Sequence, residues 1–159
     1  MAASFTSQGI IYAATQSQSS DANTLDDYEE GTWAATISTT GTDFTTSGRA
    51  TGAIYTKIGQ QVMTNAFPSI NSPSSGTGNI TMTGFPFAPV DGVVSAGLYM
   101  GRFDLSGDFG YHATIAGGTS VCTFLFQNNN ANPTTMAAAQ INGNSTPYLG
   151  VSFFYRTAG

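Results

Sequence analysis

Short apolar runs alternate with polar residues along most of the chain, and Gly, Asn, Pro and Ser separate these runs. Such a pattern predicts β-strands rather than amphipathic helices. Many short strands between turn signals indicate an all-β chain, and we expect an antiparallel, jelly-roll-like β-sandwich. The segments expected to form strands are 32–38, 53–57, 61–70, 79–83, 93–104, 111–116, 120–127 and 148–156.

The apolar runs differ in whether we expect one face or both faces of the strand to be buried. Residues 80–83 alternate apolar side chains with hydroxyls, as a strand with one wet face does. Residues 121–126 and 151–155 are apolar nearly throughout, so we expect cover on both sides, with another subunit as one source of it. Pro68 confines its strand to a sheet edge or marks a bulge. The segment 136–140 predicts one helical turn inside a loop.

The first part of the chain has a different composition. Residues 1–23 consist mainly of Ser, Gln, Ala and Thr, which is typical of an arm that gains order only against a neighbour. An acidic stretch then ends at Gly31, where we expect a turn. We therefore divide the chain into an arm and connector (1–30) and a β-sandwich head domain (31–159).

Charge excludes one class of partner. Only 8% of the residues are charged, and the formal net charge is −5. The cations are scattered along the chain, so they form no basic patch that could neutralise a phosphate backbone. They are Arg49, Lys57, Arg102 and Arg156. We expect no nucleic-acid partner, and because no apolar run approaches about 20 residues, no membrane insertion.

The acidic stretch is the first candidate for catalysis. Its members are Asp26, Asp27, Glu29 and Glu30. Paired carboxylates could serve a glycosidase, one as a neutral acid and one ionised. Four like charges in an exposed patch do not create the apolar surroundings that keep an acid protonated. We therefore expect a solvated face or a turn cap.

The other reactive residues are isolated. His112 is the only histidine and Cys122 the only cysteine, so neither has a sequence neighbour for a metal site or a catalytic triad. Cys122 lies in an apolar run and is expected to pack as a small buried hydrophobe. Residues 104–115 resemble a calcium loop only faintly, with Phe109 and Ile115 where Gly and Glu are needed. We predict a non-enzymatic chain without metal or cofactor residues.

Recognition is the function left open by this inventory. Loops rich in Asn, Ser, Thr and Gly with interspersed aromatic residues are typical of binding surfaces. Phe44, Tyr99 and Tyr148 are candidates for facing a ligand. The alternative is that each packs into the core, as aromatic residues in strand-like segments usually do.

The segment 21–33 reads Asp-Ala-Asn-Thr-Leu-Asp-Asp-Tyr-Glu-Glu-Gly-Thr-Trp. It resembles a motif of tail-fibre and other virion-surface proteins of tailed bacteriophages, especially marine and cyanobacterial ones. Further pieces follow in the family's order at 54–59, Val62, 80–87 and 151–155, so the resemblance covers about 16–156. This chain has Ala34 and Ala35 where the family usually has Thr-Pro, so it lacks the proline that would stiffen the strand.

The resemblance implies a homotrimeric β-sandwich on the virion surface, assembled in the bacterial cytoplasm and attached to capsid or tail proteins through its arm. A capsid-decoration, head-fibre or tail-fibre component is the leading interpretation. The alternative is a tail-fibre tip that binds host-cell surface glycan, and a more distant one is a polysaccharide-degrading enzyme. Leu25, Tyr28 and Trp33 are expected to anchor the connector in grooves between subunits.

Overall fold

The computed structural model describes residues 4–11, 27–44, 49–50, 52–70, 73–90, 92–101, 109–128, 131–141 and 146–158. This part of the chain is all-β, apart from the short 3-10 helix η1 (Ala138–Gln140). The strands are β1 (Ser4–Thr6), β2 (Gly9–Ile11), β3 (Tyr28–Trp33), β4 (Thr36–Thr39), β5 (Arg49–Ala50), β6 (Ala53–Ile58), β7 (Gln61–Ala66), β8 (Ser69–Ile70), β9 (Ile80–Thr83), β10 (Val93–Gly101), β11 (Phe109–Ala116), β12 (Cys122–Asn128), β13 (Thr134–Thr135) and β14 (Tyr148–Arg156).

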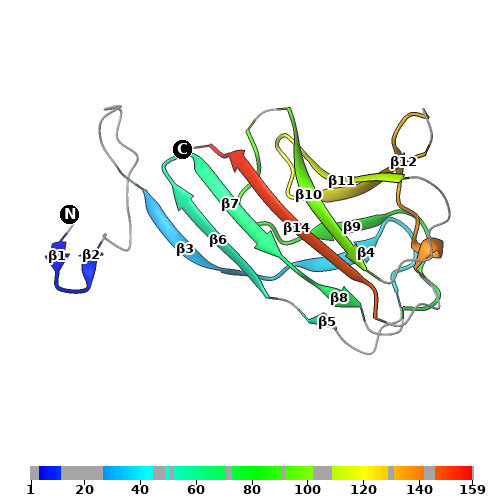
Figure 1. The fold of residues 1–159 in the computed structure, drawn as a ribbon, viewed down its shortest axis with the longest axis horizontal. Helices are drawn as coiled ribbons and strands as arrows, with labels where there is room; N and C mark the ends of the chain where they lie inside the picture. Colours follow the sequence, from blue (N-terminus) through cyan, green and yellow to red (C-terminus); the bar gives the residue numbers. More distant parts are fainter. Residues whose placement is uncertain are drawn as a thin grey trace.

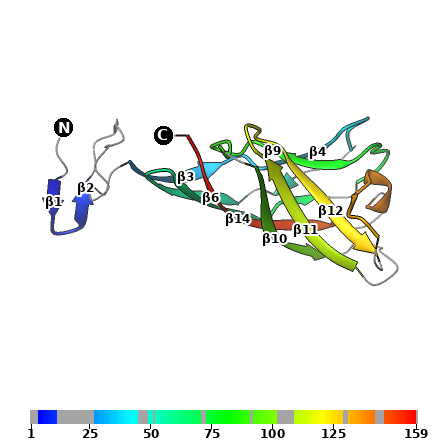
Figure 2. The same ribbon diagram turned by 90° about the horizontal axis from the view of Figure 1, so that it is seen from above.

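One antiparallel sheet curls around a single core (Figures 1 and 2). Its main path runs β3-β6-β7-β14-β10-β11-β12-β9-β4. We call the part from β3 to β10 the β14 half and the part from β10 to β4 the β12 half. The end strands β3 and β4 are consecutive in sequence, with only Ala34 and Ala35 between them, so the chain passes directly from one half to the other.

Strand β10 belongs to both halves. Residues 93–96 pair with β11, whereas residues 97–101 pair with β14. The change of partner falls between Ala96 and Gly97. Here, as between β3 and β4, the chain passes from one half of the sheet to the other.

The core is built from the inward side chains of both halves. Strand alternation directs every second residue inward, so apolar residues at these positions become buried together. The β14 half contributes Trp33, Val62 and Phe153, and the β12 half contributes Ile37 and Phe124 among others.

Each predicted strand overlaps at least one strand of the structure, with local differences. Residues 148–156 form β14 as predicted, and residues 136–140 contain the short helix η1. The predicted strand 32–38 is split into β3 and β4 by Ala34 and Ala35, where the chain passes from one half of the sheet to the other. Pro68 separates β7 from β8, because it has no N–H to continue the ladder. The short strands β1, β2, β5 and β13 were not predicted.

The expected two-sided cover of β14 is wrong for the single chain. Its residues alternate between buried and exposed from Val151 to Arg156. Phe154 is 60% exposed on the outer face, between the buried residues Phe153 and Tyr155. A near-continuous apolar run therefore has one face in the core and the other on the molecular surface.

The head begins earlier than the sequence division placed it. Tyr28, Glu29 and Glu30 already pair with β6, so these residues belong to the curled sheet and not to the connector. Before them, β1 and β2 form a two-stranded antiparallel sheet of their own, with exposed side chains. Leu25 and Asp26 lie outside the described residues.

Candidate functional site

Two regions of the β14 half gather chemically distinctive side chains. The first surrounds β3, the strand formed by the sequence motif that ends at Trp33. Alternation directs Glu29, Gly31 and Trp33 to the inner side, and Tyr28 and Thr32 to the outer side. The motif therefore presents different chemistry on its two faces.

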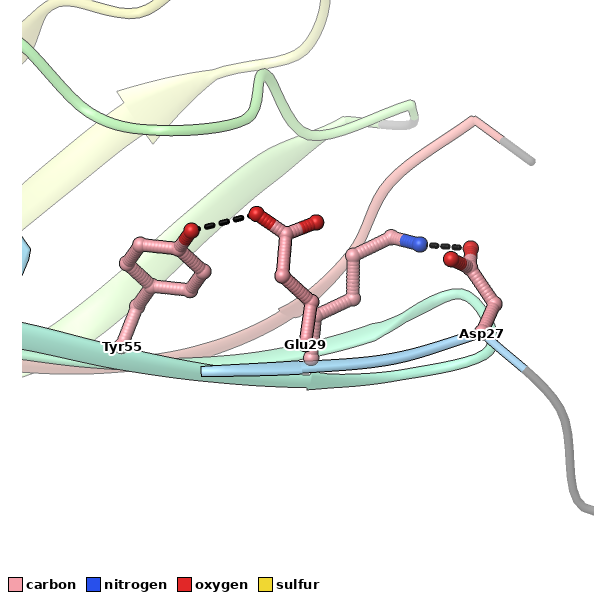
Figure 3. A network of polar contacts seen from close by, with 4 residues as sticks. Asp27, Glu29 and Tyr55 are labelled. Carbon is pink, nitrogen blue, oxygen red and sulfur yellow. Dashed lines mark hydrogen bonds and ion pairs between the residues drawn. The ribbon is translucent and has the colours of Figure 1, made fainter. Parts of the chain in front are cut away.

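Lys57 is the central cation of this region. Only 5% of the residue is exposed, although a buried lysine is costly unless its charge is paired. Its Nζ donates to Asp27 Oδ2 in an ion pair (Figure 3). The same Nζ lies 5.6 Å from the centroid of the Phe87 ring, within the range of a cation–π contact. Asp27 thus provides the charge that makes the burial of Lys57 tolerable.

Tyr55 holds the next acid of the motif. Its hydroxyl donates to Glu29 Oε1 (Figure 3). Its ring meets Phe87 edge-on at a centroid distance of 5.6 Å. The hydrogen bond to Glu29, followed by burial and by the negative charge of that carboxylate, raises the pKa of Tyr55. We call Asp27, Glu29, Tyr55, Lys57 and Phe87 the β3 network.

Gly31 has a different role from the turn expected in the sequence. It lies within β3 opposite Tyr55, and a Cβ atom there would stand 3.0 Å from the Tyr55 ring and hydroxyl. A side chain at this position would crowd the tyrosine ring, which crosses the strand here to reach Glu29.

Trp33 is part of the core of its own chain. It is 8% exposed, its ring centroid lies 4.5 Å from that of Phe85, and its Nε1 donates to the Ile54 carbonyl at 3.2 Å. Its own chain already buries it, because inward alternation places it over the core, so little of the side chain is left exposed for the predicted groove between subunits. Tyr28 is half-buried on the outer side, where its hydroxyl donates to Glu30 Oε2 at 2.7 Å.

The acids of the motif that the structure describes have structural partners. Asp27 pairs with Lys57, Glu29 accepts from Tyr55, and Glu30 accepts from Tyr28. A glycosidase needs two carboxyl groups facing each other across a substrate groove. Among the described residues, no group of three or more His, Cys, Asp or Glu side chains could hold a metal ion.

The second region is a groove on the outer face of the same half. Phe67, just after β7, and Tyr99 on β10 form its aromatic wall, with ring centroids 5.4 Å apart and planes 33° from parallel. Asn65 and Ser152 form the polar side, where Asn65 Nδ2 donates to Ser152 Oγ at 2.8 Å. We call this feature the aromatic groove.

Glycines shape the floor of the aromatic groove. Gly97 pairs with Ser152, and a Cβ atom at Gly97 would meet nothing within 4 Å, so the space above it is open. Gly150 does the opposite: a Cβ there would lie 2.5 Å from the Phe67 ring, which rests directly on the backbone. Missing side chains thus leave a depression at Gly97 and let an aromatic ring approach the backbone closely at Gly150.

The residues predicted to face a ligand separate into two groups. Tyr99 is 61% exposed in the groove wall, and Tyr148 is half-buried beside it, stacked on Phe67 at a centroid distance of 5.8 Å. Phe44 is 7% exposed and packs in the core, so its expected role is wrong; its loop directs the ring inward over Gly76. Sequence reasoning missed Phe67, although alternation from Met63 through Asn65 places it outside.

Two isolated residues complete the inventory. Burial raises the pKa of the Cys122 thiol to about 12, so it stays protonated and unreactive near neutral pH. His112 is half-buried on β11. In the described ranges, no helix has the length and apolar character needed to cross a membrane.

Comparisons with protein-family models, curated proteins and solved structures find no match to this chain.

Proposed function

We propose that this chain is a structural, non-enzymatic protein of a tailed-bacteriophage surface, attached through its N-terminal arm and displaying the curled sheet outward. The observation that carries this proposal is the β3 network. The last six residues of the segment that resembles the phage motif form an end strand of the sheet, and Asp27 and Glu29 bind Lys57 and Tyr55 of the neighbouring strand. Such an arrangement suits a joint between a leading segment and a displayed head.

The finer features of the proposal follow from the resemblance. The head is a jelly-roll-like sandwich that assembles as a homotrimer on the virion, with capsid or tail proteins as the partners of the arm. A trimer would also cover apolar outer-face side chains such as Ile54, Met63 and Phe154, which are more than half exposed in the single chain. Light scattering coupled to gel filtration measures the mass of the assembly directly and so tests whether it is a trimer.

Gold-labelled antibody against the chain, applied to intact particles of the phage that encodes it, tests the location. Label on the head identifies a decoration or head-fibre protein, and label on the tail identifies a fibre component. Unlabelled particles, with the protein free in the lysate, would contradict the proposal.

A variant lacking residues 1–26 tests the mode of attachment. It removes β1 and β2 but keeps all of β3, so its circular dichroism should match that of the full chain apart from the small contribution of those two short strands. We expect the full chain to sediment with particles that lack the native protein, and the shortened chain to stay in solution. Equal sedimentation of both would show that another surface makes the attachment.

A second candidate function is recognition of host-cell surface glycan, as in a receptor-binding fibre tip. The observation that favours it is the aromatic groove, which combines exposed rings with an amide and a hydroxyl.

A further inference from the structure

We infer that the aromatic groove binds a neutral sugar ring, which stacks on Tyr99 and hydrogen-bonds to Asn65 and Ser152. This inference deepens the second candidate function by naming the site and the chemical class of its ligand. It does not depend on whether the protein lies on a phage particle.

The two sides of the groove match the two kinds of surface on a pyranose. One face of such a ring carries C–H bonds with slight positive charge, which pack on the negative face of an aromatic ring. Its hydroxyl groups need both donors and acceptors, which an amide and a hydroxyl side chain provide together. Phe67 and Tyr99 offer the first surface, and Asn65 and Ser152 the second.

The charge of the groove selects a neutral ligand. None of its lining residues is charged: they are Asn65, Ala66, Phe67, Gly97, Leu98, Tyr99, Gly150, Val151 and Ser152. An acidic sugar or a phosphate would lose water there without gaining a cation. An uncharged hexose loses only hydroxyl hydration, which the polar side can replace.

The rings are positioned in advance. Phe67 packs over Gly150 and stacks on Tyr148, so two contacts of its own chain restrict its movement. Tyr148 in turn lies beside Gly101, where a Cβ atom would stand 3.1 Å from its ring. Binding to a wall that is already ordered costs less entropy than binding to loose side chains.

Gly97 provides the most specific part of the inference. It forms one cross-strand row with Ser152 and Asn65, and its missing side chain leaves open space between the polar and aromatic sides. Valine is a favoured strand residue, so Gly97→Val should preserve the fold while filling the depression. A binding role and a purely structural role therefore predict different results for this substitution.

The test is a nitrogen-15 NMR titration of the full chain with the methyl glycosides of glucose, galactose and mannose. We expect at least one glycoside to shift the amide signals of Asn65, Gly97 and Ser152 in a saturable manner. Gly97→Val should weaken binding by about tenfold or more because it fills the depression, and Tyr99→Ala should do so because it removes the stacking surface. The matched control is Phe154→Ala, which removes an exposed ring of the same face outside the groove and should leave binding unchanged.

Three outcomes would overturn the inference. One is the lack of any saturable shift with all of the glycosides. Another is an equal response to cyclohexanol, which would indicate a general apolar patch. The third is a set of groove shifts that depend on protein concentration alone, which would identify a second copy of the chain as the occupant. Particle labelling is independent of these results, so failure of the proposed virion location is distinguishable from failure of sugar binding.

Discussion

The two faces of the β14 half are made by the same strands but are built differently. On the inner face, Val62, Phe153 and Tyr155 are almost fully buried. On the outer face, Met63 and Phe154, their direct neighbours in sequence, are more than half exposed. Apolar side chains on the inner face stabilise the fold by packing in the core, whereas those on the outer face contribute little to the stability of the single chain. The comparison separates residues kept for folding from residues available for contact.

The largest effect is expected from emptying an inner-face position. Phe153→Ala should lower the free energy of unfolding by about 3–5 kcal/mol, because it leaves a cavity in the core. The cavity would lie beside Phe85, whose ring centroid is 5.4 Å from that of Phe153. Urea unfolding, at a concentration where gel filtration shows single chains, measures the change. Phe154→Ala is the matched outer-face control and should cost less than about 1 kcal/mol. Similar losses in the two variants would abolish the distinction between the faces.

The β3 network should give the next largest effect. Lys57→Met keeps an unbranched apolar side chain but leaves Asp27 without its cation, so we expect a loss of about 1.5–3 kcal/mol in unfolding free energy. Adding Asp27→Asn should recover part of the loss, because the uncompensated charge is then removed. A Lys57→Met variant as stable as the original chain would show that the ion pair does not hold β3.

The core should also make stability depend on pH in the alkaline range. Burial raises the pKa of Cys122 from 9.0 to about 12 and that of Tyr155 from 10.0 to about 12. At neutral pH both groups are protonated in both states. At higher pH the unfolded chain releases these protons first, so stability should fall as the pH rises toward 12.

Thermal melts from pH 7 to 11.5 measure this fall, and Tyr155→Phe should make it shallower. In the original chain the Tyr155 hydroxyl donates to the Phe87 carbonyl at 2.8 Å. Because the variant lacks this hydrogen bond, it should also lose about 1 kcal/mol at neutral pH. Melting temperatures that do not change with pH would contradict the expected effect of Cys122 and Tyr155 on stability.

The smallest effect concerns the groove floor. Gly97→Ala adds a Cβ atom to open space in a strand. Since glycine loses more conformational freedom on folding than alanine does, stability should rise by about 0.5 kcal/mol or stay unchanged. Gly150→Ala is the contrasting variant, since its Cβ would displace the Phe67 ring. A clear destabilisation by Gly97→Ala would mean that the depression is not open.

Local pattern was sufficient to predict much of the fold. The extent of β14 and the approximate position of β6 follow from alternation and turn residues, which are local properties. The halves of the sheet were not predictable in this way, because β10 changes partners without any break in its own pattern. Register between strands depends on contacts that are distant in sequence.

The candidate site was predictable only in part for the same reason. Tyr99 and Tyr148 were identified by residue type, but Phe67 joins them through the pairing of β14 with its neighbours. The direction of Trp33 depends on strand phase, where a shift of one residue reverses the face. Likewise, the partner of Asp27 lies 30 residues away at Lys57 and becomes adjacent only when β3 pairs with β6.

The geometry of β3 also has a mechanical consequence. All six residues of this strand are paired with β6, and the chain then continues through Ala34 and Ala35 into β4 in the other half. Tension applied along β3 from the residues before it would load its cross-strand hydrogen bonds together, in shear, instead of opening them one at a time. A head tethered at this end would resist drag from flowing liquid better than one held by a strand that peels.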